Sequence, residues 1–405
     1  MSEQIGVLIV GVKGAVSTTL ISAGIAVRLG LPCRFDLPSE QDPLLAGAEL
    51  PPLSAMHFGG WDVASASLAE SLRHHQVIPS ELVDHIAPHL DERFISAGVT
   101  LTPAPIHDEL DAEICRAAES SSLRVLVDKL RQDIQNFKRQ LSVKRVVVLD
   151  LSSTAPSVAP SHYHARLADF ETVLDLPIQE SLAVNAVHEG MLYAYAAISE
   201  GCPCVNFTPS TTFDIPALLE LARAQGVPLC GKDGKTGQTL YKTAIAPLLR
   251  QRALKVTGWY STNILGNRDG EVLDHPEHRK TKIDSKTAVL ADLLGYDDFD
   301  HQVHIHYYKP RGDAKEAWDN IDFEGWFGVP MQMKINWLGS DSILAAPLAA
   351  DLIRWMVFYH QHGVSGVVNT LSSYFKSPLE SNTHDVFAQV NFLRMDVQGR
   401  LKESP

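Results

Sequence analysis

Lysines and small polar residues are concentrated in two segments in the middle of the chain. GKDGKTGQT (Gly231 to Thr239) combines glycines, lysines, threonines and a glutamine, which together can grip a phosphate through backbone N–H groups and side chains. RKTKIDSK (Arg279 to Lys286) places four cations in eight residues. A charge run alone is more often a solvated face. On a helix, however, Lys282 and Lys286 share one face, and clustered, partly desolvated ammonium groups suit proton transfer or oxyanion stabilisation.

Two further segments carry residues that could hold a sugar or act on it. STNILGNRDG (Ser261 to Gly270) contains Asn263, Asn267 and Asp269, which can exchange hydrogen bonds with sugar hydroxyls. The same composition is also typical of a Gly/Asn loop between elements. Lys376 lies between apolar residues in SYFKSPL, where most lysines are snorkelling surface residues.

The N-terminal segment contains a weak dinucleotide-binding signal. GVKGAVST (Gly11 to Thr18) follows an apolar run and departs from GxGxxG, with Lys13 and Ser17 at two of the glycine positions. A glycine turn there presents backbone N–H groups at a helix N-terminus, where a pyrophosphate is favoured. Asp36 lies at the distance of a ribose-binding carboxylate, or caps a turn. FGGWD (Phe58 to Asp62) indicates a backbone close to a flat ligand, or a Gly-Gly turn with a core tryptophan and a helix-capping aspartate.

The histidines and cysteines do not indicate a metal site. In HQVHIH, His304 and His306 would point to one face of a strand, but no cysteine or acidic cluster with ligand spacing accompanies them. We therefore expect no bound metal. The five cysteines are scattered along the chain, at Cys33, Cys115, Cys202, Cys204 and Cys230. An odd, dispersed set argues against a disulfide framework and favours a reducing cytoplasm.

Composition excludes several classes of protein. The 405 residues include 35 Lys+Arg and 48 Asp+Glu, a formal charge of −13, whereas a general nucleic-acid binder is net basic. The apolar fraction of 45% is that of a globular chain with a sizeable core. The longest apolar stretches, such as Ile5 to Val12, fall short of the roughly 20 residues that a membrane span needs. The N-terminus has no basic segment ahead of an apolar one, so we expect no signal peptide.

Short apolar runs alternate with helical patterns, which predicts an α/β protein with a Rossmann-type, doubly wound parallel sheet. Strands are predicted at Ile5–Val10, Arg145–Leu151 and Pro203–Phe207, and helices at Leu20–Leu29, Ala64–His75, Leu123–Leu141, Leu182–Glu200 and Ile215–Gln225. Alternating stretches at Val303–Tyr308 and Met331–Trp337 predict further strands before a helix at Leu348–His360. We expect a dinucleotide-binding domain from residues 1–204, completed by 346–405, and an inserted α+β catalytic and oligomerisation domain at 205–345.

Taken in order, these segments resemble the inositol-3-phosphate synthase family, the NAD-dependent cyclases of glucose 6-phosphate. The resemblance is close to continuous from Leu182 to Lys376 and patchy before residue 180. Its markers are FGGWD, NFTPSTTF, GKDGKTGQT, STNILGNRDG, KTKIDSK, KPRGDAK, SDSILAAPL and SYFKSPL. The resemblance implies a redox-neutral cycle with bound NAD. Hydride leaves C5 of the open-chain sugar, an enolate at C6 attacks the C1 aldehyde, and the ring ketone takes the hydride back. It also implies a homotetramer.

The family pattern implies roles for individual residues. Lys282 is the proton-transfer lysine at the C5 hydroxyl, Lys376 is its partner, oriented by Asp233, and Asp341 is a carboxylate near the nicotinamide and the lysines. The implied substrate-binding residues are Lys286, Thr236, Gly237, Gln238, Thr239, Asn263, Asn267, Asp269, His306 and Lys309. The implied cofactor-binding residues are Gly11, Gly14, Ala15, Val16, Ser17, Asp62, Ser152, Thr154 and Asp341.

The chain also departs from the family pattern. His306 occupies the position of a family lysine, so a permanent cation has become a titratable one. NFTPSTTF adds bulk at Phe207 and removes an amide at Ser210, Lys232 replaces an acid, and so does Ser340. These changes surround the substrate. Alternatives are therefore a cyclase that closes a five-membered ring from fructose 6-phosphate in carbocyclic nucleoside biosynthesis, a non-catalytic sugar-phosphate or NAD-binding homologue, and an ordinary dehydrogenase.

Overall fold

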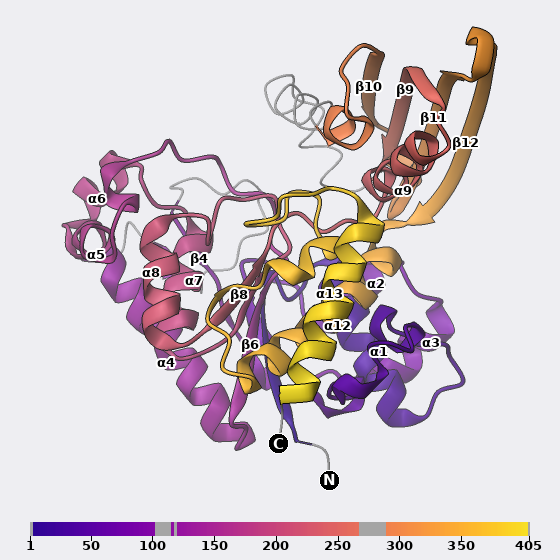
Figure 1. The fold of residues 1–405 in the computed structure, drawn as a ribbon. Helices are drawn as coiled ribbons and strands as arrows, with labels where there is room; N and C mark the ends of the chain where they lie inside the picture. The colour runs from indigo at the N-terminus through magenta and orange to yellow at the C-terminus, as the bar shows by residue number, and fades with distance from the viewer. Residues whose placement is uncertain (1–2, 102–114, 117–119, 267–288, 404–405) are drawn as a thin grey trace.

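The computed structural model of the protein describes residues 3–101, 115–116, 120–266 and 289–403 (Figure 1). A large α/β body carries both chain ends on one side, and a smaller sheet projects from its opposite end. The site lies between these two parts.

The body is built on a seven-stranded sheet whose neighbouring strands are all parallel. The strand order is β13 (Gly366–Val367), β8 (Pro228–Gly231), β7 (Cys204–Asn206), β6 (Arg145–Asp150), β1 (Ile5–Val10), β2 (Met56–Asp62) and β3 (Ile95–Ala97). From β1 the chain winds outward through β2 and β3, then crosses to β6 and winds the other way. The predicted doubly wound α/β fold is confirmed, and its switch point lies between β1 and β6.

Helices cover both faces of this sheet (Figure 1). One face carries α1 (Ala15–Leu29), α2 (Leu68–His75), α3 (Ser80–Ile86), α12 (Asp341–Gln361) and α13 (Val386–Glu403), and the other carries α4 (Leu123–Leu141), α5 (Leu167–Asp175), α6 (Ile178–Val184), α7 (Glu189–Ser199) and α8 (Pro216–Gln225). The side chains of β1 alternate between the two cores: Val7 and Ile9 belong to one, Leu8 and Val10 to the other. Burial on both faces explains why this strand is apolar at every position.

Helix α12 is the longest apolar element of the described chain. Its length and composition would allow it to cross a membrane, but 78% of its most apolar window is buried inside the protein. It contacts α1 along one face of the large sheet. Its hydropathy is therefore that of a core helix.

A second sheet of four strands follows helix α9 (Gln238–Gln251). Its order is β10 (Asp300–Tyr307), β9 (Lys255–Leu265), β11 (Ala314–Glu324) and β12 (Pro330–Ser340). The face toward α9 buries Trp259 and Ile321 in a small apolar core with Ala246 and Leu249 of the helix. The opposite face exposes Trp318. A minor pair, β4 (Val99–Thr100) and β5 (Cys115–Arg116), lies apart from both sheets.

Most predicted elements are present, with two differences. The continuous helix expected at Leu182–Glu200 is wrong: Asn185 adopts a left-handed conformation that ends α6, and His188 caps the start of α7 with its side chain. Short polar caps of this kind override apolar periodicity. In addition, β7 and β8 pair within the large sheet, so this sheet continues past residue 204.

Candidate active site

A glycine turn opens at the switch point of the large sheet. Gly11 has φ +79°, and a Cβ there would lie 3.0 Å from Ser152 Cα, so the close approach of β1 and β6 requires glycine. Ser17 Oγ donates to Gly11 O at 2.7 Å and closes the turn. Gly14 precedes α1 without a side-chain cap, and the first turn has no acid. The N–H groups of this turn are therefore suited to a phosphate.

Asp62 ends β2 beside this turn. Its Oδ2 accepts from Lys13 N at 2.7 Å and its Oδ1 from Ala64 N at 2.9 Å, which fixes the carboxylate at the carboxyl edge of the sheet. The glycines of FGGWD serve packing instead: a Cβ on Gly60 would lie 2.0 Å from Ile9 O on the neighbouring strand. Asp36 lies in the loop before β2 and pairs with Arg34. The acid at the end of β2 is therefore Asp62, and not Asp36. The loop between α1 and β2 places it further along the chain than the usual spacing predicts.

These features fit a nicotinamide dinucleotide. A Cβ at Gly14 would meet Gly11 O at 3.2 Å, so the turn brings bare backbone to its surface. Gly14 and the following Ala15, Val16 and Ser17 would hold the pyrophosphate, and Asp62 can accept from ribose hydroxyls. Ser152 is held by its N–H and Oγ, which both donate to Asp150 Oδ1. Thr154 is exposed at the same edge.

A lysine and an aspartate meet across the adjoining end of the sheet. Lys376 Nζ lies 2.6 Å from Asp233 Oδ1, and both side chains are mostly buried. Lys376 N also donates to Asp233 O, and Gly234 bridges to Phe375 in antiparallel fashion. The pair is thus positioned by backbone as well as by charge. The predicted partnership of these two residues has the geometry expected of it.

A second ammonium group approaches Asp341 at the start of α12. Lys315 Nζ lies 3.1 Å from Asp341 Oδ1, and Thr236 Oγ1 donates to the same oxygen at 3.1 Å. Burial by itself would raise the pKa of Asp341, but the charges of Lys315 and Lys376 and these hydrogen bonds outweigh it and lower that pKa. Asp341 therefore stays ionised between two lysines and fixes both ammonium groups electrostatically.

The N-terminus of α9 faces the same place. Gly237 caps the helix without a side-chain cap, and no acid lies in the first turn. A Cβ on Gly237 would lie 3.1 Å from Lys315 Cε and 3.4 Å from its Nζ. Thr236, Gln238 and Thr239 flank this cap and are buried. A helix N-terminus with an ammonium group beside it suits a phosphate.

The dinucleotide turn and the lysine site are joined by the loop that follows β7. Phe207 N donates to Asp150 O at 3.1 Å, beside Ser152. Further along, Asp233 N donates to Thr208 O at 2.9 Å. The two halves of the site therefore lie along the carboxyl ends of adjacent parallel strands, where α/β proteins bind ligands.

The remaining predicted residues divide into three groups. Lys282, Lys286, Asn267 and Asp269 lie outside the described residues. Asn263 is buried on β9 and donates to Gln238 Oε1 at 2.7 Å. His306 and Lys309 are exposed. His306 pairs with Ile264 in the register, whereas Asn263 pairs with Ile305, so the His306 side chain lies on the face of the sheet away from α9.

Lys315 is the site residue that sequence reasoning missed. From KPRGDAK we selected Lys309, whereas the last lysine of the motif contacts Asp341. A signal was available: in AKEAWDNIDF the apolar residues Ala317 and Ile321 stand an even number of positions from Lys315, so strand alternation places Lys315 on the same, inner face of β11.

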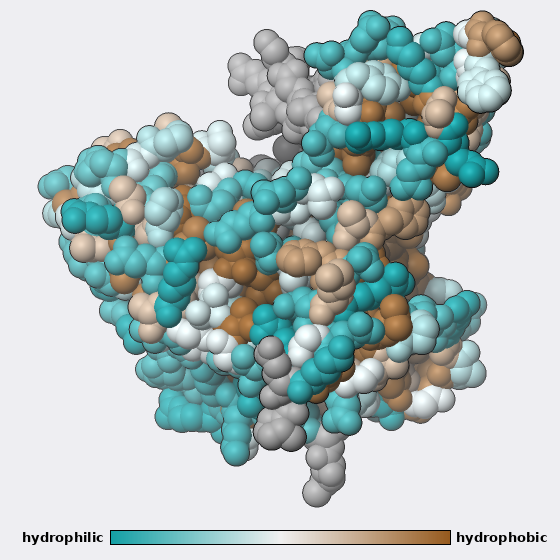
Figure 2. All heavy atoms as spheres, in the orientation of Figure 1, coloured by the Kyte–Doolittle hydropathy of each residue, from teal (hydrophilic) through white to brown (hydrophobic). Residues whose placement is uncertain are grey.

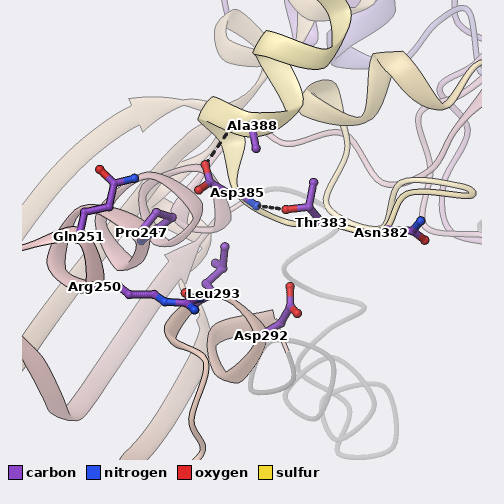
Figure 3. Close-up of a pocket in the computed structure, with 9 residues that line it drawn as sticks. All are labelled: Pro247, Arg250, Gln251, Asp292, Leu293, Asn382, Thr383, Asp385 and Ala388. Atoms are coloured by element: carbon purple, nitrogen blue, oxygen red, sulfur yellow. Dashed lines mark hydrogen bonds between the residues drawn. The ribbon is translucent and has the colours of Figure 1, made fainter. Parts of the chain in front are cut away.

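One hollow of the described chain lies away from this site. It measures about 560 Å³, lies between the end of α9 and the start of α13, and contains none of the predicted site residues (Figure 3). Two of its charged groups are engaged locally: Asp385 accepts from Phe387 N and Ala388 N, and Arg250 donates to Leu293 O. We assign it no part in the site.

The glycine turn at a switch point, the acid at the end of β2 and the adjoining lysine pairs are the features of an NAD-dependent enzyme of the Rossmann class that acts on an anionic substrate. The sequence matches the family described as myo-inositol-1-phosphate synthase over residues 39–398. It is 36% identical to inositol-3-phosphate synthase 1 of Bacteroides thetaiotaomicron, covering 99% of this chain and 96% of that protein. The chain belongs to the myo-inositol-1-phosphate synthase family, and the resemblance in the sequence is confirmed.

More distant relatives show the same similarity in sequence and fold. The inositol-3-phosphate synthase of Saccharomyces cerevisiae is 27% identical over 87% of this chain and 73% of that protein. The crystal structure of inositol-3-phosphate synthase from Caenorhabditis elegans has the same fold, with a TM-score of 0.83 at 22% identity over 99% of this chain and 86% of that one. A related protein from Thermotoga maritima superposes with a TM-score of 0.74 at 23% identity, covering 98% and 99% of the two chains.

Proposed function

We propose that the protein converts glucose 6-phosphate to inositol 3-phosphate with NAD as a recycled cofactor. The observation that carries this proposal is the convergence of Lys376, Lys315 and the N-terminus of α9 around Asp341, beside the dinucleotide turn. An enolate and an alkoxide form during such a cyclisation, and fixed cations stabilise both. Held by the glycine turn and Asp62, NAD would supply the hydride acceptor and donor for this cycle.

Side chains of this protein carry out proton transfer and phosphate binding. Lys376, held by Asp233, is positioned to move a proton at a substrate oxygen, because its Nζ has a fixed direction and a carboxylate to balance its charge. Lys315 and the first turn of α9 bind the phosphate. Asp341 balances the positive charge of Lys315 and Lys376. By the family pattern, Lys282 transfers the proton at the C5 hydroxyl, Lys286 assists at the phosphate, and Asn267 and Asp269 bind sugar hydroxyls.

Product analysis tests this function. The protein is incubated with NAD and either glucose 6-phosphate or fructose 6-phosphate, and the products are identified by NMR. We expect inositol phosphate from glucose 6-phosphate with no build-up of free NADH. A five-membered carbocycle from fructose 6-phosphate, net NADH formation, or calorimetric binding without product would each replace the proposal by another function. The same assay on Lys282→Ala should show no turnover with unchanged NAD binding.

We also propose a homotetramer, assembled through the projecting sheet. Its outer face and hairpin tip expose large apolar side chains, including Trp318 (47% exposed), Leu338 (64%), Trp326 (83%) and Phe327 (99%). Figure 2 shows apolar side chains gathered at that tip. Apolar surface of this kind marks an interaction site.

The domain division is proposed on the same basis. The large sheet with α12 and α13 would form the dinucleotide-binding domain, and α9 to β12 would form the inserted domain. The insertion would then start after β8.

A cytoplasmic location belongs to the same proposal. Cys33, Cys202, Cys204 and Cys230 are free thiols, and the last three are buried. Burial raises the pKa of the Cys204 and Cys230 thiols well above the usual value, which makes them inert.

A further inference from the structure

A buried carboxylate lies directly behind the first turn of α9. Asp319 on β11 is 3% exposed and accepts four hydrogen bonds. Trp259 Nε1 and Ser261 Oγ donate to its Oδ1 at 2.7 Å each, and the Gln238 amide donates to both oxygens at 3.1 and 3.0 Å. Every partner is itself buried. The sequence analysis predicted no role for Asp319.

The buried ammonium of Lys242 keeps this carboxylate in a charged environment. Lys242 lies one turn along α9 from Gln238, over the Trp259 ring at 5.6 Å and 2.8 Å from His301 Nε2. Burial lowers the pKa of Lys242 to about 8, while the charge of Asp319 acts in the opposite direction. The charge of Lys242 and that of Asp319 therefore act on one another inside this buried cluster.

The chemistry of these groups leaves only one orientation for two amides. Asp319 is the acceptor in all four of these hydrogen bonds, so the NH2 end of Gln238 faces it. Gln238 Oε1 then faces β9, where it accepts from Asn263 Nδ2 at 2.7 Å. The NH2 end of Asn263 is thereby committed to Gln238, which leaves its carbonyl oxygen as the end that can accept from another donor. Asp319 thus determines, through Gln238, which end of the Asn263 amide is the donor and which is the acceptor.

We propose that Asp319 is a positioning residue that makes Asn263 present a hydrogen-bond acceptor to a hydroxyl of the sugar. The proposal rests on the proposed function, since Asn263 is a substrate-binding position by the family pattern. An acceptor selects a hydroxyl, which can donate. It rejects a group of similar size that can only accept. The relay therefore contributes to substrate specificity without Asp319 touching the substrate.

The first test is Asp319→Asn, which changes one oxygen to an amide donor at constant size. The new amide NH2 at position 319 would face the Gln238 NH2, so Gln238 must turn over, and Asn263 must turn over in response. The Asn263 amide then offers a donor in place of an acceptor. We expect kcat/KM for glucose 6-phosphate to fall about 10- to 100-fold, mainly through KM, because a buried mismatch of this type costs one to two factors of ten. The Kd for NAD should be unchanged.

A compensating change distinguishes a relay from a structural role. Asn263→Asp alone places a carboxylate against Gln238 Oε1 and should also lower kcat/KM. In the double variant D319N/N263D, the turned Gln238 donates to the new carboxylate at position 263, whose second oxygen is again available as an acceptor. We expect the double variant to exceed both single variants in kcat/KM. Additive losses, or a wild-type KM in D319N, would overturn the proposal.

Asp133→Asn is the matched control. Asp133 also accepts from a tryptophan, with Trp61 Nε1 at 3.0 Å, but lies on α4. It should keep the wild-type KM, and a KM shift as large as that of D319N would contradict the relay. Wild-type product formation tests the proposed function separately.

A measurement on the unmodified fold covers the case in which D319N does not fold. Inhibition constants are measured for the 2-, 3- and 4-deoxyfluoro derivatives of glucose 6-phosphate, since fluorine accepts but does not donate. With wild type, one derivative should bind at least about 10-fold more weakly than the others, and Asn263→Ala should remove that difference. If no derivative behaves in this way, Asn263 does not present an acceptor.

Discussion

Lys376 Nζ lies 2.6 Å from Asp233 Oδ1, although 143 positions separate the two residues in the chain. The lysine follows the 3₁₀ segment Asn369–Tyr374, and the aspartate follows β8, the strand paired with β13 just before that segment. Sheet topology therefore determines this contact. The same topology brings the C-terminal part of the chain, which carries Lys376, into a site otherwise built from its middle.

Removing the ammonium of Lys376 should abolish catalysis without loss of the cofactor. In Lys376→Met we expect kcat to fall by at least about 100-fold, the usual loss for a proton-transfer group, because methionine keeps the volume and loses the proton. The NAD dissociation constant, measured by calorimetry, should stay within a factor of two or so, since the substitution leaves the glycine turn and Asp62 unchanged. Lys255→Met, at an exposed position on β9, is the control. A kcat close to wild type would remove Lys376 from the mechanism.

Two lysines of one motif should differ in importance. Lys315 contacts Asp341 inside the site, whereas Lys309 is exposed in the turn before β11. We expect Lys315→Met to raise the KM for glucose 6-phosphate by about 100-fold, because a charge-assisted contact to phosphate is lost. Lys309→Met should change KM much less. Steady-state kinetics of both variants under identical conditions measure the two KM values. A larger increase in KM for Lys309→Met than for Lys315→Met would show that Lys309 is the lysine that binds the substrate.

Asp62 should determine NAD affinity. A carboxylate at the end of β2 that accepts two ribose hydroxyls contributes roughly 1.5 to 3 kcal/mol per charge-assisted bond. We expect Asp62→Ala to weaken NAD binding by about 10-fold or more, as seen by calorimetry, whereas Asp36→Ala should bind NAD like wild type. Equal effects of the two substitutions would mean that the ribose lies elsewhere.

The sequence predicted the fold because apolar runs and glycine turns follow from local physics. The run at Ile5–Val10 and the glycine turn at Gly11 each carry their own signal, and the two cores of the sheet follow from alternation. Asp62 was harder to interpret, because the glycines beside it serve packing against Ile9.

The contacts of the site could not be predicted in the same way. Pairings such as Lys315 with Asp341 and Asp319 with Gln238 join different elements, and only register and tertiary packing place them together. His306 illustrates the reverse case. Aligning it with a family lysine suggested a place in the site, but the strand register directs its side chain away from α9. A substrate-binding role for His306 stays a prediction.

Stability should rise with pH because of Lys235. This lysine is 2% exposed, and burial lowers its pKa from 10.5 to about 8, although Nζ donates to Gln389 Oε1 at 2.9 Å. Between these two pH values the unfolded chain binds more protons than the folded one, so the free energy of unfolding increases with pH. Below pH 8 the buried charge costs about 3 kcal/mol.

Replacing Lys235 isolates this contribution. Lys235→Met has no charge to bury, so its free energy of unfolding relative to wild type should decrease by about 2 to 3 kcal/mol between about pH 7 and 10. Urea unfolding at several pH values measures this difference, and groups common to both proteins cancel in it. A difference that is independent of pH would show that Lys235 is not titrating with a lowered pKa.

Charge on the outer face of the projecting sheet should prevent assembly. Trp318 and Leu338 lie on β11 and β12, are 47% and 64% exposed, and belong to the face away from α9. Burying a glutamate in a subunit interface is unfavourable, so W318E/L338E should shift the proposed tetramer to smaller species in light scattering coupled to size-exclusion chromatography. Val125→Glu provides the matched control, since Val125 is also 47% exposed but lies on α4 of the main body. Because each subunit contains the glycine turn at Gly11 and the Asp62 carboxylate within its own chain, NAD binding should survive dissociation. An unchanged tetramer in W318E/L338E would place the interface on another surface.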